Sequence, residues 1–245
     1  MKAVVLGAGG RTGSLVVEEL IRRNIKTKIV VRNIEKVPAE LRNNELIECI
    51  SGNITEFDSG KNLELINDCS AVISCLGHNI NLRGIFGKPR LLVTRSVESI
   101  CKAIEESKKR KVKVILMSST AVRNKKIGEN YSRKDRIVLS LLNILLPPQK
   151  DNVRAADYLI KNTGENNRFI EWVCVRPDTL INEAGKSEYR ILESPERSPV
   201  SDPGKTSRGA VAEFMVDLLS DEGLWEKWKY RMPVIYSSGG GKGGV

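Results

Sequence analysis

Residues 3–22 read AVVLGAGGRTGSLVVEELIR, and this stretch decides the fold. Its first four residues are an apolar run typical of a buried strand, and residues 12–22 have the apolar spacing of an amphipathic helix. A dinucleotide pyrophosphate needs a strand, a glycine turn and a helix, because glycines allow close approach and helix N–H groups point at negative charge. A purely structural turn is the alternative. The predicted cofactor contacts in the turn are Gly7, Gly9, Gly10, Arg11, Thr12 and Gly13.

The same alternation of strand and helix patterns continues to about residue 236. The expected strands are residues 3–6, 28–31, 46–50, 71–76, 113–117, 169–175 and 233–236, and the expected helices are residues 12–22, 58–66, 95–108, 133–146, 151–161 and 207–219. We therefore predict an α/β fold, a Rossmann-like doubly wound parallel sheet covered on both faces. Residues 1–237 are expected to form one NAD(P)-binding domain with substrate-binding elements in its C-terminal half, and residues 238–245 a flexible glycine-rich tail.

The composition argues against nucleic-acid binding and membrane insertion. The 245 residues include 40 basic and 30 acidic side chains, a net charge of +10, but only 5% are aromatic. The basic run at residues 108–111 follows a helix pattern, where cations suit the helix dipole, and no stacking platform accompanies it. No charged segment followed by an apolar stretch opens the chain, and its longest apolar run is too short to cross a bilayer. We expect a cytoplasmic protein without a membrane span.

The cysteines and the single histidine predict neither disulfides nor a metal site. Five cysteines are an odd number, they lack Cys-x-x-Cys spacing, and three lie in apolar, strand-like stretches. We expect buried thiols in a reducing compartment. His78 is the only histidine, which excludes a histidine-rich metal centre, and we interpret it as an ordinary loop residue.

The longest apolar segment runs from Ile137 to Leu146 and is apolar nearly all round. Such a helix is buried in a core, covers a ligand, or meets a partner chain, which includes a second copy of the same chain. Simple burial is the interpretation that we adopt, and the other two stay open.

Arg32 sets the expected cofactor preference. It follows the second strand, about twenty residues beyond the glycine turn, where an acidic residue would accept hydrogen bonds from the adenosine ribose. A carboxylate would repel a 2′-phosphate, whereas a guanidinium binds it bidentately. The sequence therefore predicts NADP(H), with Arg11 as a second contact to the same phosphate. A solvated arginine at a strand end is the alternative.

Residues that follow the strands are further candidates, because ligands of open α/β sheets bind beyond the carboxyl ends of the strands. Asn53 has an amide that can hydrogen-bond the adenine edge, and Gly77 lets the backbone pass close to a ribose. Ser119 follows the fifth strand, near the expected nicotinamide, although strand-end serines also serve as turn formers. The predicted cofactor contacts at strand ends are Asn53, Ile54, Cys75, Leu76, Gly77, Ser118, Pro177 and Asp178.

These segments together resemble an atypical short-chain dehydrogenase/reductase of the NmrA-like, NAD(P)H-binding group, and within it the biliverdin-IXβ reductase/flavin reductase type. The matching stretches are residues 7–13, 30–33, 52–55, 71–77, 114–119, 169–178 and 206–219, in the family's order. The resemblance implies NADPH held by the glycine turn and Arg32. It also implies that Ser119 is the strand-five serine near the nicotinamide and that Asp178 lines the nicotinamide end.

The resemblance does not bring a complete catalytic set. It puts Lys150 at the tyrosine position and Arg154 at the lysine position of the family's Tyr-x-x-x-Lys helix, so the phenolic proton donor is missing. Four residues apart on one helical face, these cations can clamp a nicotinamide ribose or an anionic substrate. Two solvated cations are the alternative. We name Ser119, Lys150 and Arg154 as the candidate catalytic residues.

Two hypotheses of different functional classes follow from these predictions. The first is an NADPH-dependent reductase that passes hydride to a conjugated small-molecule acceptor, such as a flavin, a quinone or a linear tetrapyrrole, for which solvent can supply the proton. The second is a sensor of the NmrA type that binds NADP(H) without reacting and changes its partners. An isomerase or epimerase of the same fold is a third hypothesis.

Overall fold

The computed structural model describes residues 1–78, 90–129, 131–183 and 188–237. The strands are β1 (Lys2–Leu6), β2 (Lys26–Val31), β3 (Ile47–Ser51), β4 (Ala71–Ser74), β5 (Val112–Met117), β6 (Ile170–Pro177), β7 (Thr179–Ile181), β8 (Tyr189–Leu192), β9 (Lys205–Ser207) and β10 (Val234–Ser237). The α-helices are α1 (Arg11–Arg22), α2 (Ala39–Arg42), α3 (Ser59–Ile66), α5 (Leu92–Ser107), α6 (Arg133–Leu145), α7 (Pro147–Tyr158), α8 (Arg208–Ser220) and α9 (Glu222–Trp228). The predicted tail, residues 238–245, lies outside the described residues.

The central sheet has the strand order β3-β2-β1-β4-β5-β6-β10-β8. Every neighbouring pair from β3 to β10 is parallel, and only β8 runs antiparallel, against β10. The predicted Rossmann-like doubly wound sheet is therefore confirmed. The chain turns from building the sheet on one side to building it on the other between β1 and β4, and ligands of such sheets bind at the carboxyl ends of the strands beside this switch point.

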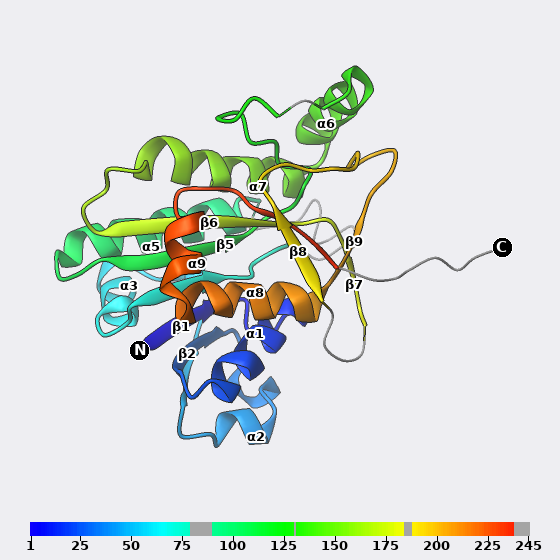
Figure 1. Ribbon diagram of the computed structural model, residues 1–245. Helices are drawn as coiled ribbons and strands as arrows, with labels where there is room; N and C mark the ends of the chain where they lie inside the picture. The colour runs from blue at the N-terminus through cyan, green and yellow to red at the C-terminus, as the bar shows by residue number, and fades with distance from the viewer. Residues whose placement is uncertain (79–89, 130, 184–187, 238–245) are drawn as a thin grey trace.

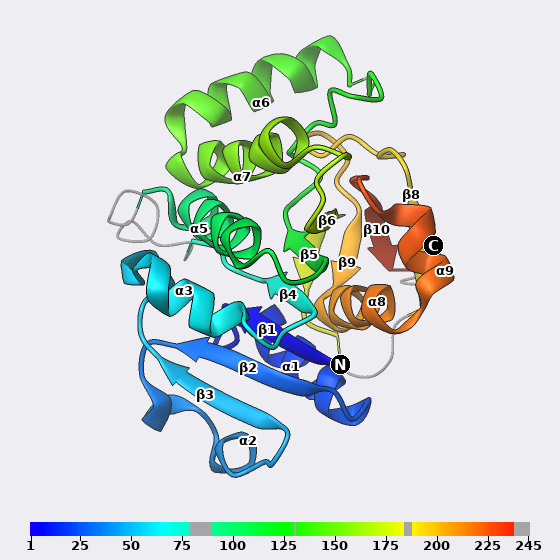
Figure 2. The ribbon, with the colours of Figure 1, turned by 90° about the vertical axis from the view of Figure 1, so that its left-hand side faces the viewer.

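Each face of the sheet has its own apolar core, because successive side chains of a strand point to opposite faces. Ala3 and Val5 of β1 face the core packed against α1 and α8. Val4 and Leu6 face the core packed against α3, α5 and α7. Figure 2 shows these two helical layers on opposite sides of the strands.

Several short elements in the C-terminal third were not predicted. These are β8 at the sheet edge, the parallel pair formed by β7 and β9, and helix α9. Strands of three or four residues that include polar side chains are too short to show a recognisable hydrophobic alternation in the sequence. Helix α7 also begins at Pro147, four residues before the predicted start at Asp151, because proline suits the first turn of a helix.

Helix α6 corrects the predicted burial of the apolar segment. Its residues Ile137, Leu141, Ile144 and Leu145 are 62%, 51%, 73% and 64% exposed, whereas Leu139 is buried. The helix packs chiefly on α7 and projects from the body of the molecule (Figure 1). A single helical neighbour can cover only one side of a helix, so the opposite apolar face stays exposed. Within the described ranges, no helix has the length and hydropathy to span a membrane.

Candidate functional site

The glycine turn between β1 and α1 is held by close backbone contacts. Gly7 has a φ of +80°, and a Cβ there would lie 2.9 Å from the carbonyl carbon and oxygen of Cys75. A Cβ at Gly13 would lie 2.1 Å from the Gly7 oxygen. The Gly10 N–H donates to that same oxygen at 2.9 Å. Glycine at positions 7 and 13 is therefore required by packing alone.

Gly9 and Gly77 differ, because a Cβ at either position would meet no atom of the described chain within 4 Å. The protein backbone at the turn and at the end of β4 is thus accessible to a ligand. Helix α1 begins beside it with Gly10 as its N-cap, without a capping side chain and without an acidic residue in its first turn. The N–H groups near Arg11 and Thr12 can therefore receive an anion, and these residues fit the pyrophosphate of a dinucleotide.

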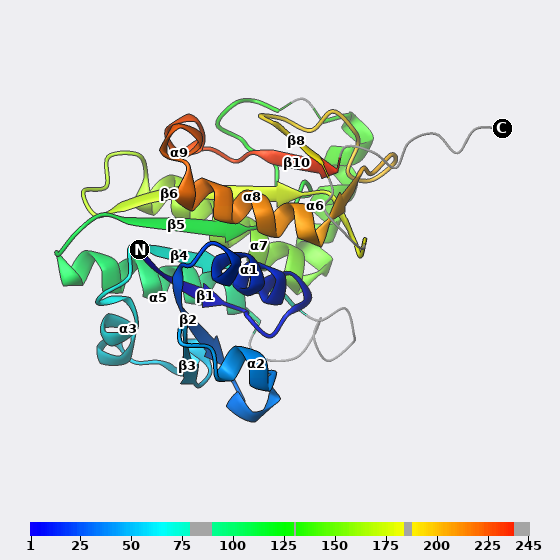
Figure 3. The same cartoon turned by 60° about the horizontal axis from the view of Figure 1, so that its bottom comes forward.

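Three arginines lie at the ends of elements next to the glycine turn: Arg11 begins α1, Arg32 follows β2, the strand beside β1, and Arg208 begins α8. Arg11 and Arg32 are exposed, and neither pairs with a carboxylate among the residues that the structure describes. Arg208, the first residue of α8, was not predicted, and it lies here because α8 packs alongside α1 (Figure 3). Burial and the nearby charge of Arg11 both lower the pKa of Arg208, whose Nη1 donates to Asn182 Oδ1 at 2.8 Å. The rim of the glycine turn is therefore strongly positive.

The side chain of Asn53, which follows β3, makes hydrogen bonds within the turn to which it belongs. The Asn53 Oδ1 atom accepts hydrogen bonds from Thr55 N at 3.3 Å and Thr55 Oγ1 at 3.0 Å, and its amide donates to Glu56 at 2.8 Å. Ile54 is 4% exposed and belongs to the core beneath α3 and α5. The side chain of Asn53 thus already caps a 3₁₀ turn. Its contact with the adenine stays a prediction.

The end of β4 passes in front of the glycine turn. The Cys75 N–H donates to Leu6 O at 2.9 Å, which extends the pairing of β4 with β1 by one residue. Cys75 is buried, and burial raises the pKa of its thiol to about 12. Leu76 is half-buried, whereas Gly77 is exposed. The backbone at Gly77 can therefore line a ligand, and the Cys75 thiol stays protonated and unreactive.

The ends of β5 and β6 meet at the carboxyl edge of the sheet. The Ser118 N–H donates to Val175 O at 2.8 Å, and the Thr120 N–H donates to Pro177 O at 3.1 Å. Ser118 is buried, and its Oγ has no hydrogen-bond partner in the described part of the chain. Ser119 is half-buried. Of these two serines, Ser119 presents the more accessible hydroxyl.

Asp178 is enclosed at this edge. Its Oδ1 accepts the Thr179 N–H at 2.8 Å, and its Oδ2 faces Gly204, where an added Cβ would lie 3.4 Å from it. Burial raises the pKa of Asp178 above its ordinary value, against the opposing hydrogen bonds from the backbone at Gly204 and Thr179. The carboxyl group therefore retains its proton to a higher pH than a solvated aspartate does.

A buried ion pair fixes the loop that follows β5. Arg176 donates through Nη2 to Glu129 Oε1 at 2.6 Å and through Nη1 to Glu129 Oε2 at 3.0 Å, and both side chains are 0% exposed. The same guanidinium donates to the carbonyls of Val122, Glu193 and Met232. Arg176 thus ties three loops together at the carboxyl edge, where Ser118 and Ser119 lie.

His78 is not an ordinary loop residue. Its Nε2 lies 2.8 Å from Asp151 Oδ2, and its side chain is 7% exposed. Asp151, on α7, also accepts hydrogen bonds from the N–H groups of Val93 and Thr94 and from the Thr94 hydroxyl. Burial opposes ionisation of this carboxyl group, but the hydrogen bonds prevail and hold its pKa below the ordinary value. Asp151 therefore caps α5 and joins it to the end of β4.

The two predicted cations of α7 lie together in an open hollow. It has a volume of about 450 Å³ and is lined by Arg90, Leu91, Arg95, Ile144, Pro147, Lys150 and Arg154. Lys150 and Arg154 are exposed, and within the described chain none of the four lining cations pairs with a carboxylate. The spacing in the sequence found Lys150 and Arg154, but Arg90 and Arg95 precede or begin a helix and gave no signal.

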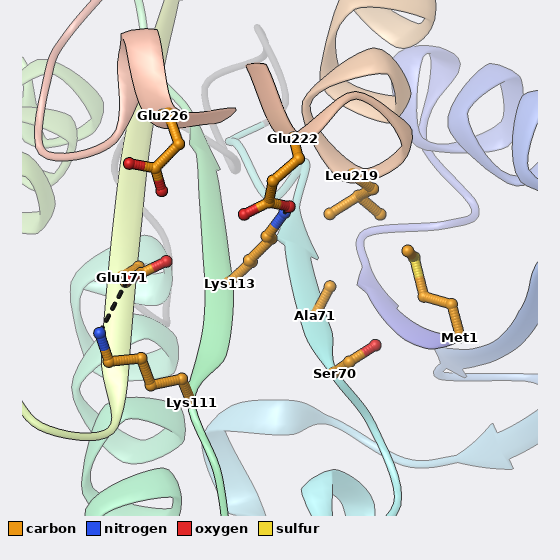
Figure 4. A pocket seen from close by; sticks show the side chains of 9 residues that line it. All are labelled: Met1, Ser70, Ala71, Lys111, Lys113, Glu171, Leu219, Glu222 and Glu226. Carbon is orange, nitrogen blue, oxygen red and sulfur yellow. Dashed lines mark hydrogen bonds and ion pairs between the residues drawn. The ribbon is translucent and has the colours of Figure 1, made fainter. Parts of the chain in front are cut away.

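A second hollow lies at the opposite edge of the sheet, at the amino ends of the strands (Figure 4). It has a volume of about 330 Å³, and its charges neutralise one another. Lys113 Nζ lies 2.8 Å from Glu222 Oε2, and Lys111 Nζ lies 3.0 Å from Glu171 Oε1. Because ligands of such sheets bind at the carboxyl edge, this second hollow is not the candidate site.

Comparison with known proteins agrees with this geometry. Residues 7–222 match the model of a family described as NAD(P)H-binding. An uncharacterized chloroplastic protein of Arabidopsis thaliana is 27% identical over 222 residues, which cover 90% of this chain and 72% of that protein.

Solved structures share the fold. A short-chain dehydrogenase/reductase from Veillonella parvula in complex with NADP has a TM-score of 0.69 at 18% identity, over 97% of this chain and 95% of that one. An anaerobilin reductase from Escherichia coli O157:H7 has a TM-score of 0.68 at 12% identity, over 99% of this chain and all of that one. The family match covers most of the chain and includes the open glycine turn, and the protein is therefore a member of the NAD(P)H-binding family.

Proposed function

We propose that this protein is an NADPH-dependent reductase that transfers hydride to a conjugated small-molecule acceptor. The observation that carries the proposal is the open surface at Gly9 and Gly77, next to a helix N-terminus that lacks a capping side chain. Nothing in the packing of the described residues explains why these two positions lack a side chain. A pyrophosphate and a ribose that lie directly on the backbone do explain it.

The preference for NADPH rests on the arginines of the rim. Arg32 takes the place of the acidic residue that would bind the ribose hydroxyls of NADH. Arg11 and Arg208 add positive charge at the neighbouring ends of α1 and α8. A phosphate that carries about two negative charges would relieve the repulsion between these cations, whereas a ribose hydroxyl would not.

The family resemblance implies that the nicotinamide end lacks the usual proton donor of the fold, because Lys150 takes the tyrosine position. When bound, the cofactor supplies hydride, and this chain supplies the half-buried hydroxyl of Ser119 and the exposed cations Lys150 and Arg154. A carbonyl reduced to an alcohol needs a positioned acid, whereas a flavin, a quinone or a linear tetrapyrrole can take its proton from solvent. The two cations would then hold the anionic groups of the acceptor or the nicotinamide ribose.

The test is NADPH oxidation with flavin, quinone and biliverdin as separate acceptors, in the absence of oxygen. We expect turnover with at least one of them. We also expect Lys150→Gln and Arg154→Gln to raise KM for an anionic acceptor more than they lower kcat. Tight NADPH binding without turnover of any acceptor would contradict the reductase proposal and leave the cofactor assignment intact.

A cofactor-binding sensor is the second candidate, and one observation favours it. Lys150 and Arg154, which the family resemblance puts at the positions of the catalytic pair, lie exposed in an open hollow. A sensor would bind NADP⁺ and NADPH with different affinities and would change its assembly state with the cofactor's redox state. Titration of both forms, followed by analytical ultracentrifugation, separates this candidate from the reductase.

A further inference from the structure

The exposed side of α6 presents a ridge of apolar side chains, which we define as Ile137, Leu141, Ile144 and Leu145. Their spacing of four, three and one residues places them on one face of the helix. Each of these four residues is 51–73% exposed to water. From Ile137 to Leu145 the ridge covers eight residue steps, about 12 Å along the axis of α6. Contiguous apolar surface of this kind marks an interaction site.

Cationic side chains lie at both ends of the ridge. Arg133, Lys134 and Arg136 are exposed on the first turn of α6. At the other end, the hollow formed with α5 and α7 adds Arg90, Arg95, Lys150 and Arg154. In the part of the chain that the structure describes, none of these seven pairs with a carboxylate.

The acidic groups of the same face point inward. Asp135 of α6 is buried and accepts hydrogen bonds from Ser132 and Ser198. Asp151 of α7 is fully buried and caps α5. The face therefore carries positive charge outside and negative charge inside. An apolar ridge between cations complements a surface whose outer layer is negative and whose interior is apolar, as in a bilayer that contains anionic lipids.

We propose that α6 docks this protein on the surface of an anionic lipid bilayer, with the apolar ridge inserted at the acyl boundary and the seven cations against the headgroups. A second copy of the chain fits the face less well, because two such faces would bring seven cations against seven others. The proposal does not rest on the reductase activity, because the ridge and the cations Arg133, Lys134 and Arg136 lie on α6. Lys150 and Arg154, which the reductase proposal also uses, are left unchanged in the test.

The test is co-sedimentation of the full chain with vesicles of phosphatidylcholine alone or with about one third phosphatidylglycerol. We expect binding only to the anionic vesicles and release at about 0.5 M salt, where charges are screened within a few ångströms. The triple variant Arg133→Gln, Lys134→Gln and Arg136→Gln should bind roughly tenfold or more weakly. The matched control removes three exposed cations at the far end of α5, by Lys108→Gln, Lys109→Gln and Arg110→Gln, and should bind as the unmodified protein does.

A second readout follows the ridge itself. Trp172, Trp225 and Trp228 are at most 2% exposed, so brominated lipids should not quench them. We expect Leu141→Trp to be quenched on anionic vesicles and Lys109→Trp not to be. Ile137→Ser with Ile144→Ser should abolish binding without a change in Tm, because both side chains already lie in water.

Three results would overturn the proposal. They are no binding to anionic vesicles, equal binding to neutral vesicles, and equal losses in the triple variant and its control. A dimer in solution that the two serine substitutions dissociate would assign the ridge to a second copy instead.

Discussion

Arg176 and Glu129 form a bidentate ion pair in which neither side chain is exposed to solvent, with Nη2 lying 2.6 Å from Oε1. Two buried charges stabilise a fold only while both are present and hydrogen-bonded. Since Arg176 also bonds three loop carbonyls, the pair orders the carboxyl edge of the sheet between β5 and β10. This edge is where Ser118, Ser119 and Asp178 lie.

Loss of one partner of this pair should be costly. We expect Arg176→Met to lower the free energy of unfolding by about 3–5 kcal/mol, because it leaves the Glu129 carboxylate buried without its cation. Urea unfolding measures the change. The control is Arg190→Met, which breaks an exposed pair with Glu196 and should cost less than about 1 kcal/mol. Similar losses in both variants would show that burial does not determine the effect.

Two glycines of the turn should respond in opposite ways to the same substitution. A Cβ at Gly13 would lie 2.1 Å from Gly7 O, so Gly13→Ala must displace backbone and lower Tm. A Cβ at Gly9 meets no described atom within 4 Å, so Gly9→Ala should leave Tm unchanged. It should nevertheless weaken NADPH binding roughly tenfold, because the methyl group occupies the space of the pyrophosphate. Unchanged affinity in Gly9→Ala would remove the main support for the cofactor site.

The cap formed by Asp151 predicts a loss of stability in acid. Its pKa lies below the ordinary 3.8 in the folded chain, so its contribution is present above pH 3.8 and disappears as the pH falls through the folded pKa. We expect Asp151→Asn to lower the free energy of unfolding by roughly 2 kcal/mol at pH 7. The difference from the unmodified protein should shrink below pH 3.8. A difference that is constant with pH would mean that the carboxylate charge is not what matters.

Asp178 predicts the opposite pH dependence. Burial raises its folded pKa above 3.8, so the folded state binds the proton more tightly than the unfolded chain does. Its contribution is present below pH 3.8 and is lost as the pH rises through the folded pKa. We expect Asp178→Asn to be more stable than the unmodified protein at pH 8 and equally stable near pH 3. Thermal melting across this pH range measures both, and a less stable asparagine variant at pH 8 would contradict the account.

The sequence predicted the core of the fold because its signals are local. Residues 3–22 combine strand period, glycine turn and helix period, and the parallel strands that follow contain apolar runs such as residues 29–31, 71–73 and 114–117. The residues Lys150 and Arg154 could be placed together because a spacing of four defines one helical face. Sequence spacing could not predict their surroundings, since Arg90 and Arg95, at the start of α5, are 50 or more residues away along the chain.

The errors have a common physical cause. The exposure of α6 depends on how many elements pack around it, which the apolar pattern of residues 137–146 does not encode. His78, Asp151 and Arg208 owe their positions to contacts between elements that lie far apart in the sequence. Tertiary packing, and not local propensity, determined each of these.

Calorimetric titration of the protein with NADPH and NADH tests the proposed NADPH site on the glycine turn, with Arg32 at its rim, most directly. We expect NADPH to bind roughly tenfold or more tightly, because the guanidinium of Arg32 can bind a 2′-phosphate bidentately, whereas NADH has no such group. Arg32→Ala should weaken NADPH binding to the level of NADH and leave NADH unchanged. Equal affinities in the unmodified protein, or a preference that Arg32→Ala does not alter, would contradict the account.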